Sequence, residues 1–189
     1  MTHIGIFSFQ GDFEKHERMV LGLGAKATLM RSAAELAHVD GVIIPGGEST
    51  TIGKLMHAYG VLGPLRSKID EGMPVFGTCA GLILLGPHVV EKNQFRLGAL
   101  DIEVERNAYG RQVDSFEADI TIDIFGAPSI RGVFIRAPIV RSVSNGIRVL
   151  ASHEQHPVLL RKENILASSF HPELTDDPRV HEYFLSFIN

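Results

Sequence analysis

Short apolar runs alternate with amphipathic stretches through the first half of the chain. Contiguous apolar runs are typical of buried strands, and apolar positions three or four residues apart are typical of helices. Strands that alternate with helices predict a parallel sheet covered on both faces. In chain order we expect a strand at 4–9, a helix at 12–23, a strand at 27–30, a short helical segment at 33–37, a strand at 42–44, helices at 50–59 and 64–71, and a strand at 74–76.

The second half contains mostly strand-like segments. Residues 119–124 alternate strictly between polar residues and isoleucine, as a half-buried strand does. A last helix is expected after Asp177-Pro178. We therefore expect an α/β fold of three layers, with a mostly parallel central sheet and an antiparallel extension. The expected strands of this half are 100–105, 116–124, 133–135, 149–153, 157–162 and 165–170.

Composition limits the classes of protein that remain. A length of 189 residues, with 44% apolar and 21% charged residues, predicts one soluble domain over residues 1–189. The net charge of −4 and the lack of a Lys/Arg cluster disfavour nucleic acid or an anionic membrane as a partner. Residues 73–90 are uncharged, but their prolines and glycines favour a strand, turn and helix over a membrane span. One cysteine and no leader-like N-terminus predict a cytoplasmic location.

That cysteine, Cys79, lies between two glycines in the run Gly77-Thr78-Cys79-Ala80-Gly81. The spacing is that of a nucleophile elbow, a sharp turn from a buried strand into a helix. Glycines allow the tight turn, and the helix N-terminus favours a thiolate. The other interpretation is a buried structural cysteine.

A cysteine nucleophile needs a base, and the base needs an orienting group. His171 directly follows the apolar run 165–170, and Glu173 is two residues further on. Pro172 makes the turn between them rigid. We predict that His171 is the base and that Glu173 fixes its tautomer, although a histidine at a strand end is also typical of a solvated loop.

A glycine-rich loop, residues 45–51, follows the expected third strand. It lacks the phosphate-loop pattern, so we predict an oxyanion hole made by the N–H groups of Gly47 and Ala80. A plain turn with Ser49 or Thr50 as the helix N-cap is the alternative. No metal-binding motif occurs, so no metal site is expected. Two histidines of an expected hairpin are interpreted as surface residues: His153 and His156.

Three motifs resemble the triad (class I) glutamine amidotransferases: Gly-Thr-Cys-Ala-Gly at 77–81, Pro-Gly-Gly-Glu-Ser at 45–49 and Phe-His-Pro-Glu at 170–173. Within that class the chain is similar, over nearly its whole length, to the glutaminase subunits of pyridoxal 5′-phosphate synthase. The segments that carry this finer similarity are 46–51, 104–117 and 134–138. Near the start the chain departs from the family at Ser8-Phe9 and Asp12, which concerns the interface with a partner.

The resemblance implies a flavodoxin-like amidotransferase fold. It also implies hydrolysis of L-glutamine to glutamate and ammonia through Cys79, His171 and Glu173, without a cofactor, and delivery of ammonia to a synthase subunit. By charge, Glu48 suits the α-amino group of glutamine, and Arg106 and Arg136 suit its α-carboxylate. We place partner-driven activation at Gln10 and Gly11. The substrate-binding residues implied by the resemblance are Gly47, Glu48, Ser49, Arg106, Ile135 and Arg136.

Three other functions remain open at this point. One is an amidotransferase subunit that serves another synthase, as in histidine or anthranilate synthesis; the segments 104–117 and 134–138 argue against it. Another is a stand-alone cysteine γ-glutamyl hydrolase, which would be active without a partner. The third is a non-catalytic regulatory subunit, against which the intact Cys79, His171 and Glu173 argue.

Overall fold

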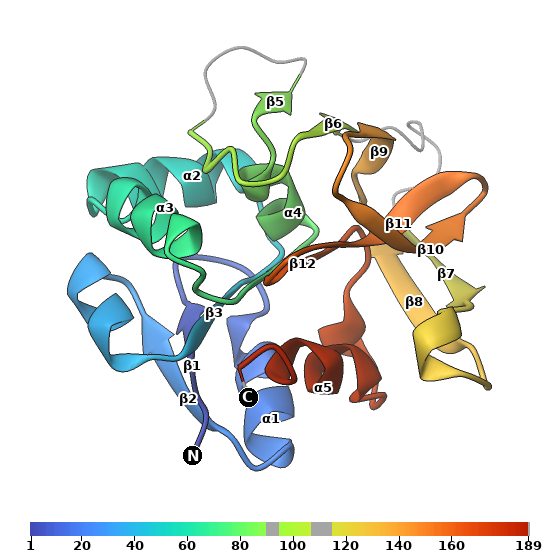
Figure 1. Cartoon of the computed structure of the whole chain (residues 1–189), viewed down its shortest axis with the longest axis horizontal. Coiled ribbons are helices and arrows are strands. Elements are labelled where there is room, and N and C mark those ends of the chain that lie inside the picture. The colour runs from blue at the N-terminus through green and yellow to red at the C-terminus, as the bar shows by residue number, and fades with distance from the viewer. Residues whose placement is uncertain (90–94, 107–114, 189) are drawn as a thin grey trace.

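A twisted seven-stranded sheet forms the centre of the computed structural model, which describes residues 1–89, 95–106 and 115–188 (Figure 1). Five neighbouring strands of this sheet run parallel, and the last two pair antiparallel at one edge. The predicted α/β fold with an antiparallel extension is therefore confirmed. Across the sheet the strands are β10 (Arg148–His153), β11 (His156–Lys162), β12 (Ile165–Ser168), β4 (Val75–Thr78), β3 (Gly41–Ile44), β1 (His3–Phe7) and β2 (Lys26–Met30).

Helices cover both faces of the sheet (Figure 1). Within β3, Val42 and Ile44 pack into one core and Ile43 into the other, because successive side chains of a strand point to opposite faces. The first core lies under α2 (Ser49–Ala58), α3 (Leu62–Asp70), α4 (Ala80–Leu85) and the 3₁₀ helix η1 (Ala33–His38). The second lies under α1 (Phe13–Gly22) and α5 (Arg179–Leu185).

Two smaller sheets lie beyond the central one. The first contains β5 (His88–Val89), β6 (Ile102–Glu105) and β9 (Ile139–Val143), and the second is the hairpin of β7 (Ser115–Ile120) and β8 (Ile130–Ile135). Neither β5 nor β9 is predicted from the sequence. Short 3₁₀ turns, η2 (Asp123–Phe125) and η3 (Pro172–Leu174), complete the described elements.

The strand predicted over 116–124 is wrong at its C-terminal end. β7 stops at Ile120, where its pairing with β8 ends at Ile130, and η2 follows. Ile122 is 1% exposed but Ile124 is 43% exposed, so the apolar alternation continues one step past the last paired residue and then breaks. The alternation of isoleucines indicates which side chains are buried. It does not establish a strand, because a strand also requires a hydrogen-bonded neighbour.

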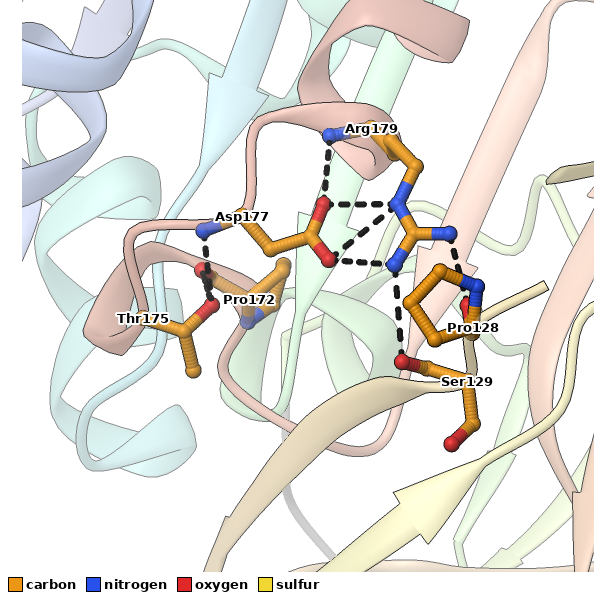
Figure 2. A network of polar contacts seen from close by, with 6 residues as sticks. All are labelled: Pro128, Ser129, Pro172, Thr175, Asp177 and Arg179. Carbon is orange, nitrogen blue, oxygen red and sulfur yellow. Dashed lines mark hydrogen bonds and ion pairs between the residues drawn. The ribbon is translucent and has the colours of Figure 1, made fainter.

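Hydrogen bonds connect the segment after β12 to the turn before β8 (Figure 2). Arg179 donates to both carboxylate oxygens of Asp177, with a shortest distance of 2.6 Å, and to the carbonyl oxygen of Pro128 at 2.8 Å. The guanidinium of Arg179 lowers the pKa of Asp177. Asp177 also accepts the backbone N–H of Arg179, and α5 begins at Arg179, directly after Asp177-Pro178 as predicted. These contacts fix the C-terminal end of the segment that contains Glu173.

The carboxyl ends of four neighbouring parallel strands form one edge of the sheet. Chain segments leaving β1, β3, β4 and β12 there contain Gln10, Gly47, Cys79 and His171 respectively. Sites in open α/β sheets form at this edge. None of the described helices is long and apolar enough to cross a membrane.

Candidate active site

Cys79 occupies the turn between β4 and α4. Its backbone has φ 48° and ψ −98°, a conformation that non-glycine residues rarely adopt, and its N–H donates to the carbonyl oxygen of Ser168 at 2.8 Å. The residue is the N-cap of α4 and is 6% exposed. The geometry matches the predicted nucleophile elbow, with the thiol at the start of a helix.

The two glycines of the elbow allow close packing rather than a positive φ. A Cβ at Gly77 would lie 2.7 Å from the Gly81 carbonyl carbon, and a Cβ at Gly81 would overlap the Ile44 carbonyl group. Strand β4, helix α4 and strand β3 are thus in backbone contact. Only glycine fits at either position without moving one of these elements.

His171 and Glu173 come from the segment after β12, the strand beside β4. His171 Nδ1 lies 2.7 Å from Glu173 Oε1, and the backbone N–H of His171 donates to the Val133 carbonyl oxygen at 2.8 Å. Both side chains are buried. The structure therefore brings together the three residues of the predicted triad; their chemical roles remain predictions.

The electrostatics of the pair suit a base next to a thiol. Burial disfavours the charged form of His171, but hydrogen bonds with Cys79 and Glu173, together with their charges, raise its pKa to about 10. Burial also disfavours the Glu173 carboxylate, yet His16 and His171 hold its pKa well below the ordinary value. At neutral pH the pair is thus an imidazolium and a carboxylate, and His171 readily holds a proton from Cys79.

A cavity of about 280 Å³ opens above Cys79. Ten of the predicted site residues contribute to its wall, whereas Glu173 lies behind His171 and Ala80 is the buried first residue of α4. The thiol of Cys79 also lies 3.9 Å from the Ile135 carbonyl oxygen, which places the end of β8 at the nucleophile. The wall consists of Gln10, Gly11, Asp12, Gly46, Gly47, Glu48, Ser49, Cys79, Ile83, Arg106, Ile135, Arg136 and His171.

Glu48 caps helix α2. Its carboxylate accepts the N–H groups of Thr50 at 3.1 Å and Thr51 at 2.7 Å, so the predicted N-cap at Ser49 or Thr50 is wrong by one or two residues. Arg106 donates to the same carboxylate at 3.0 Å. Burial opposes ionisation of Glu48, but these hydrogen bonds from Thr51 and Thr50 lower its pKa to about 2. Glu48 is therefore a helix cap and an ion-pair partner, with only part of its carboxylate left for a ligand.

Two other polar side chains at the cavity have unused hydrogen-bonding capacity. Ser49 is buried, and its hydroxyl has no hydrogen-bond partner among the described residues. Arg136 is exposed, has φ 43°, and no described acceptor or carboxylate contacts its guanidinium. An unpaired guanidinium at the mouth of a small cavity suits a carboxylate ligand. Of the predicted motif segment 104–117, residues 107–114 lie outside the described residues.

Gln10 and Gly11 contact the loop after β3. Gln10 Oε1 accepts the N–H of Glu48 at 2.7 Å, and a Cβ at Gly47, where φ is 147°, would lie 2.8 Å from the same oxygen. A Cβ at Gly11 would overlap the Gly46 carbonyl oxygen. The two predicted activation residues thus pack on the loop that was predicted to supply an oxyanion donor.

Sequence reasoning missed several residues around the site. Gly46 packs on His171, and a buried pair, His16 and His181, lies behind Glu173. The available signal was a histidine at a position where α1 or α5 is otherwise apolar.

His153 is half-buried and stacks with its ring centroid 5.5 Å from that of Phe116, so its assignment to the surface holds only in part. Outside the gaps in the described chain, no cluster of His, Cys, Asp or Glu could hold a metal ion.

The fold is that of the class I glutamine amidotransferases. The crystal structure of a glutamine amidotransferase superposes with a TM-score of 0.93 at 48% identity, over 98% of each chain. The chain belongs to the SNO glutamine amidotransferase family, whose model matches residues 6–189.

Two curated relatives extend this similarity over the full length. The pyridoxal 5′-phosphate synthase subunit PdxT of Carboxydothermus hydrogenoformans is 50% identical over 182 residues, which are 96% of this chain and 95% of the relative. The subunit of the same name from Desulforudis audaxviator is 50% identical over 189 residues and all of both chains. The predicted family is therefore confirmed.

Proposed function

We propose that this chain is the glutaminase subunit of a pyridoxal 5′-phosphate synthase. It hydrolyses L-glutamine to L-glutamate and ammonia at Cys79 and passes the ammonia to a synthase subunit. The observation that carries the proposal is the elbow cysteine beside the His171–Glu173 pair, at the base of a cavity of amino-acid size. Membership of a glutamine amidotransferase family and the names of the full-length relatives support it.

The first half of the reaction forms a thioester. His171 holds the proton of Cys79 as an imidazolium, and the thiolate sulfur attacks the side-chain amide carbon of glutamine. Negative charge moves to the amide oxygen, where the N–H groups of Gly47 and Ala80 stabilise it. The carbon–nitrogen bond then breaks as His171 returns the proton to the leaving nitrogen. Ammonia departs, and a γ-glutamyl thioester remains on Cys79.

The second half releases glutamate. Water attacks the thioester carbonyl while His171 takes one of its protons, and the carbon–sulfur bond breaks. Glu173 keeps Nδ1 of His171 protonated and stabilises the imidazolium in both halves. Each step is an acyl or proton transfer among glutamine, Cys79, His171 and water.

Substrate orientation follows from charge. Arg136 takes the α-carboxylate of glutamine, since no described residue neutralises it, and Arg106 adds positive charge while it is paired with Glu48. The Ser49 hydroxyl and the remaining lone pairs of Glu48 serve the polar groups at the α-carbon. This arrangement places the side-chain amide toward Cys79.

The partner explains why ammonia is not lost to solvent. A synthase subunit docked at the cavity mouth would receive ammonia directly, and it would bias the loop of Gly47 through Gln10. Contacts with nucleic acid or membrane are not part of this function. We also propose that residues 1–189 act as one domain and that the reaction takes place in the cytoplasm.

The test is ammonia release from glutamine by the purified chain alone and after mixing with the synthase subunit from the same genome. We expect low activity alone, a large increase with synthase, and none for Cys79→Ser with synthase present. High activity without any partner would favour a stand-alone γ-glutamyl hydrolase. Full activity of Cys79→Ser would remove the proposed chemistry.

A further inference from the structure

Two buried histidines form a chain of contacts behind the triad. His16 on α1 and His181 on α5 are both 0% exposed, and His16 Nδ1 lies 2.9 Å from His181 Nε2. His16 Nε2 lies 3.2 Å from Thr78 Oγ1 and 3.4 Å from Glu173 Oε2. Thr78 immediately precedes Cys79, so the two histidines connect both helices of this face to the nucleophile strand and to the orienting carboxylate.

The protons in this chain can be assigned from burial. Burial, which disfavours the charged form, lowers the pKa of His181 to about 3, so His181 is neutral and carries one N–H. Its Nδ1 has no hydrogen-bond partner in the described chain. A buried N–H without an acceptor is costly, so the proton belongs on Nε2 and is donated to His16 Nδ1. His16 then has its own N–H on Nε2, which faces Thr78 and Glu173.

The buried carboxylate oxygen Oε2 of Glu173 depends on the Nε2–H of His16 for a polar contact. Oε1 of Glu173 is taken by His171 at 2.7 Å, whereas Oε2 is buried and has no hydrogen bond from any described residue. The 3.4 Å contact with His16 is therefore the interaction that compensates Oε2, and it is long enough to shorten when charge builds up on His171. Lys15 and Arg18, the other cations on this side, line a cavity that reaches Glu173 but make no ion pair with it among the described contacts.

We propose that His16 is a positioning residue for the glutaminase reaction, holding Glu173 so that Oε1 stays aligned with His171, and that His181 sets the tautomer of His16. The inference rests on the proposed function. His16 does not line the cavity that holds the substrate, so its loss acts on the chemical step and leaves glutamine binding intact.

The test compares three substitutions in the complex with synthase. His16→Gln keeps an N–H near the position of Nε2, His16→Asn places one near Nδ1 only, and His16→Leu removes both. We expect His16→Leu and His16→Asn to lower kcat about 10- to 100-fold with KM changed less than about twofold. His16→Gln should stay within a few-fold of wild type. Lys15→Gln, which changes a neighbouring exposed charge, should leave kcat unchanged.

A second readout does not depend on activity. In proton NMR of the full chain, the Nδ1–H of His171 should give a far-downfield signal that persists in His16→Gln and shifts or broadens in His16→Asn. This comparison stands if His16→Leu fails to fold, because Gln and Asn are both polar. Equal kcat and equal NMR signals for the Gln and Asn variants would overturn the inference. If the wild-type chain releases no ammonia from glutamine with synthase present, the proposed function is wrong. The NMR comparison would still decide the role of His16.

Discussion

Gly46 lies directly against the imidazole of His171. A Cβ at residue 46 would overlap Cε1 of the ring and would come within 3.0 Å of Nδ1, the atom that binds Glu173. The backbone of the loop after β3 therefore forms one wall of the slot that holds the base. Glu173 holds Nδ1 of the ring and the ring also interacts with Cys79, so the loop adds a further constraint on the position of His171.

Substituting Gly46 should therefore damage catalysis more than stability. We expect Gly46→Ala to lower kcat by about 10- to 100-fold, since displacement of a base by a fraction of an ångström disturbs proton transfer. Gly63→Ala is the matched control, because no atom lies within 4 Å of a Cβ there. Ammonia release with synthase present measures the effect, and wild-type turnover of Gly46→Ala would show that His171 is not confined by this loop.

Arg136 should act on substrate binding. If its guanidinium binds the α-carboxylate, Arg136→Ala raises the KM for glutamine at least tenfold, with a smaller change in kcat. Arg131 is the control: it lies on β8, which ends just before Arg136, pairs with Glu117 and Asp119, and is not part of the cavity wall. Steady-state kinetics of both alanine variants separate the cases. An unchanged KM for Arg136→Ala would assign this arginine to the partner interface.

Gln10 should control activation by the synthase. Its Oε1 accepts the N–H of Glu48, in the peptide next to the one that carries the Gly47 N–H, the proposed oxyanion donor. One oxyanion donor changes kcat by about 10²–10³-fold, so a turn of the neighbouring Gly47 N–H away from the substrate would be enough to lose the activated state. We expect Gln10→Ala to reduce activity with synthase while the low activity of the free chain changes little. Gln155→Ala, outside the cavity, serves as control; normal activation of Gln10→Ala would contradict the relay.

His181 should make the fold sensitive to acid. Its pKa is about 3 in the folded chain and about 6.5 when unfolded. Between these values only the unfolded state gains the proton, so the free energy of unfolding falls as the pH drops through 6.5 toward 3. The facing groups His16 and Glu173 are kept in His181→Gln. Relative to wild type, this variant should lose less stability on acidification.

Urea titrations at several pH values measure that difference. From pH 6 to pH 4, the stability advantage of wild type over His181→Gln should shrink by up to about 1.4 kcal/mol per pH unit. A constant difference across this range would show that His181 is not kept neutral by burial.

The strands of the central sheet and the elbow could be predicted because their causes are local. A strand that turns tightly into a helix packed on it requires glycine at the close contacts. Gly77 and Gly81 meet this requirement, and the structure shows the backbone contacts that impose it. His171 could likewise be placed at the end of β12, because it directly follows an apolar run in the sequence. The chain order of strands and helices likewise predicted the parallel sheet and its antiparallel edge.

Long-range pairings account for what the sequence did not show. Cys79 and His171 meet because β12 pairs with β4, and no local pattern specifies that neighbour. The contact of His16 with Glu173 similarly depends on where α1 crosses the sheet. Glu48 was assigned by charge to the substrate, but its place as helix cap depends on the exact start of α2.

The most direct test of the account is labelling by a γ-electrophilic glutamine analogue, followed by peptide mapping of the chain in complex with synthase. An analogue with a leaving group next to the γ-carbonyl is bound as glutamine and alkylates the nucleophile that attacks it. We predict one label per chain, on Cys79, blocked by excess glutamine and absent in Cys79→Ser. A label on another residue, or labelling that glutamine does not block, would contradict the assignment of Cys79 as the nucleophile of a glutaminase.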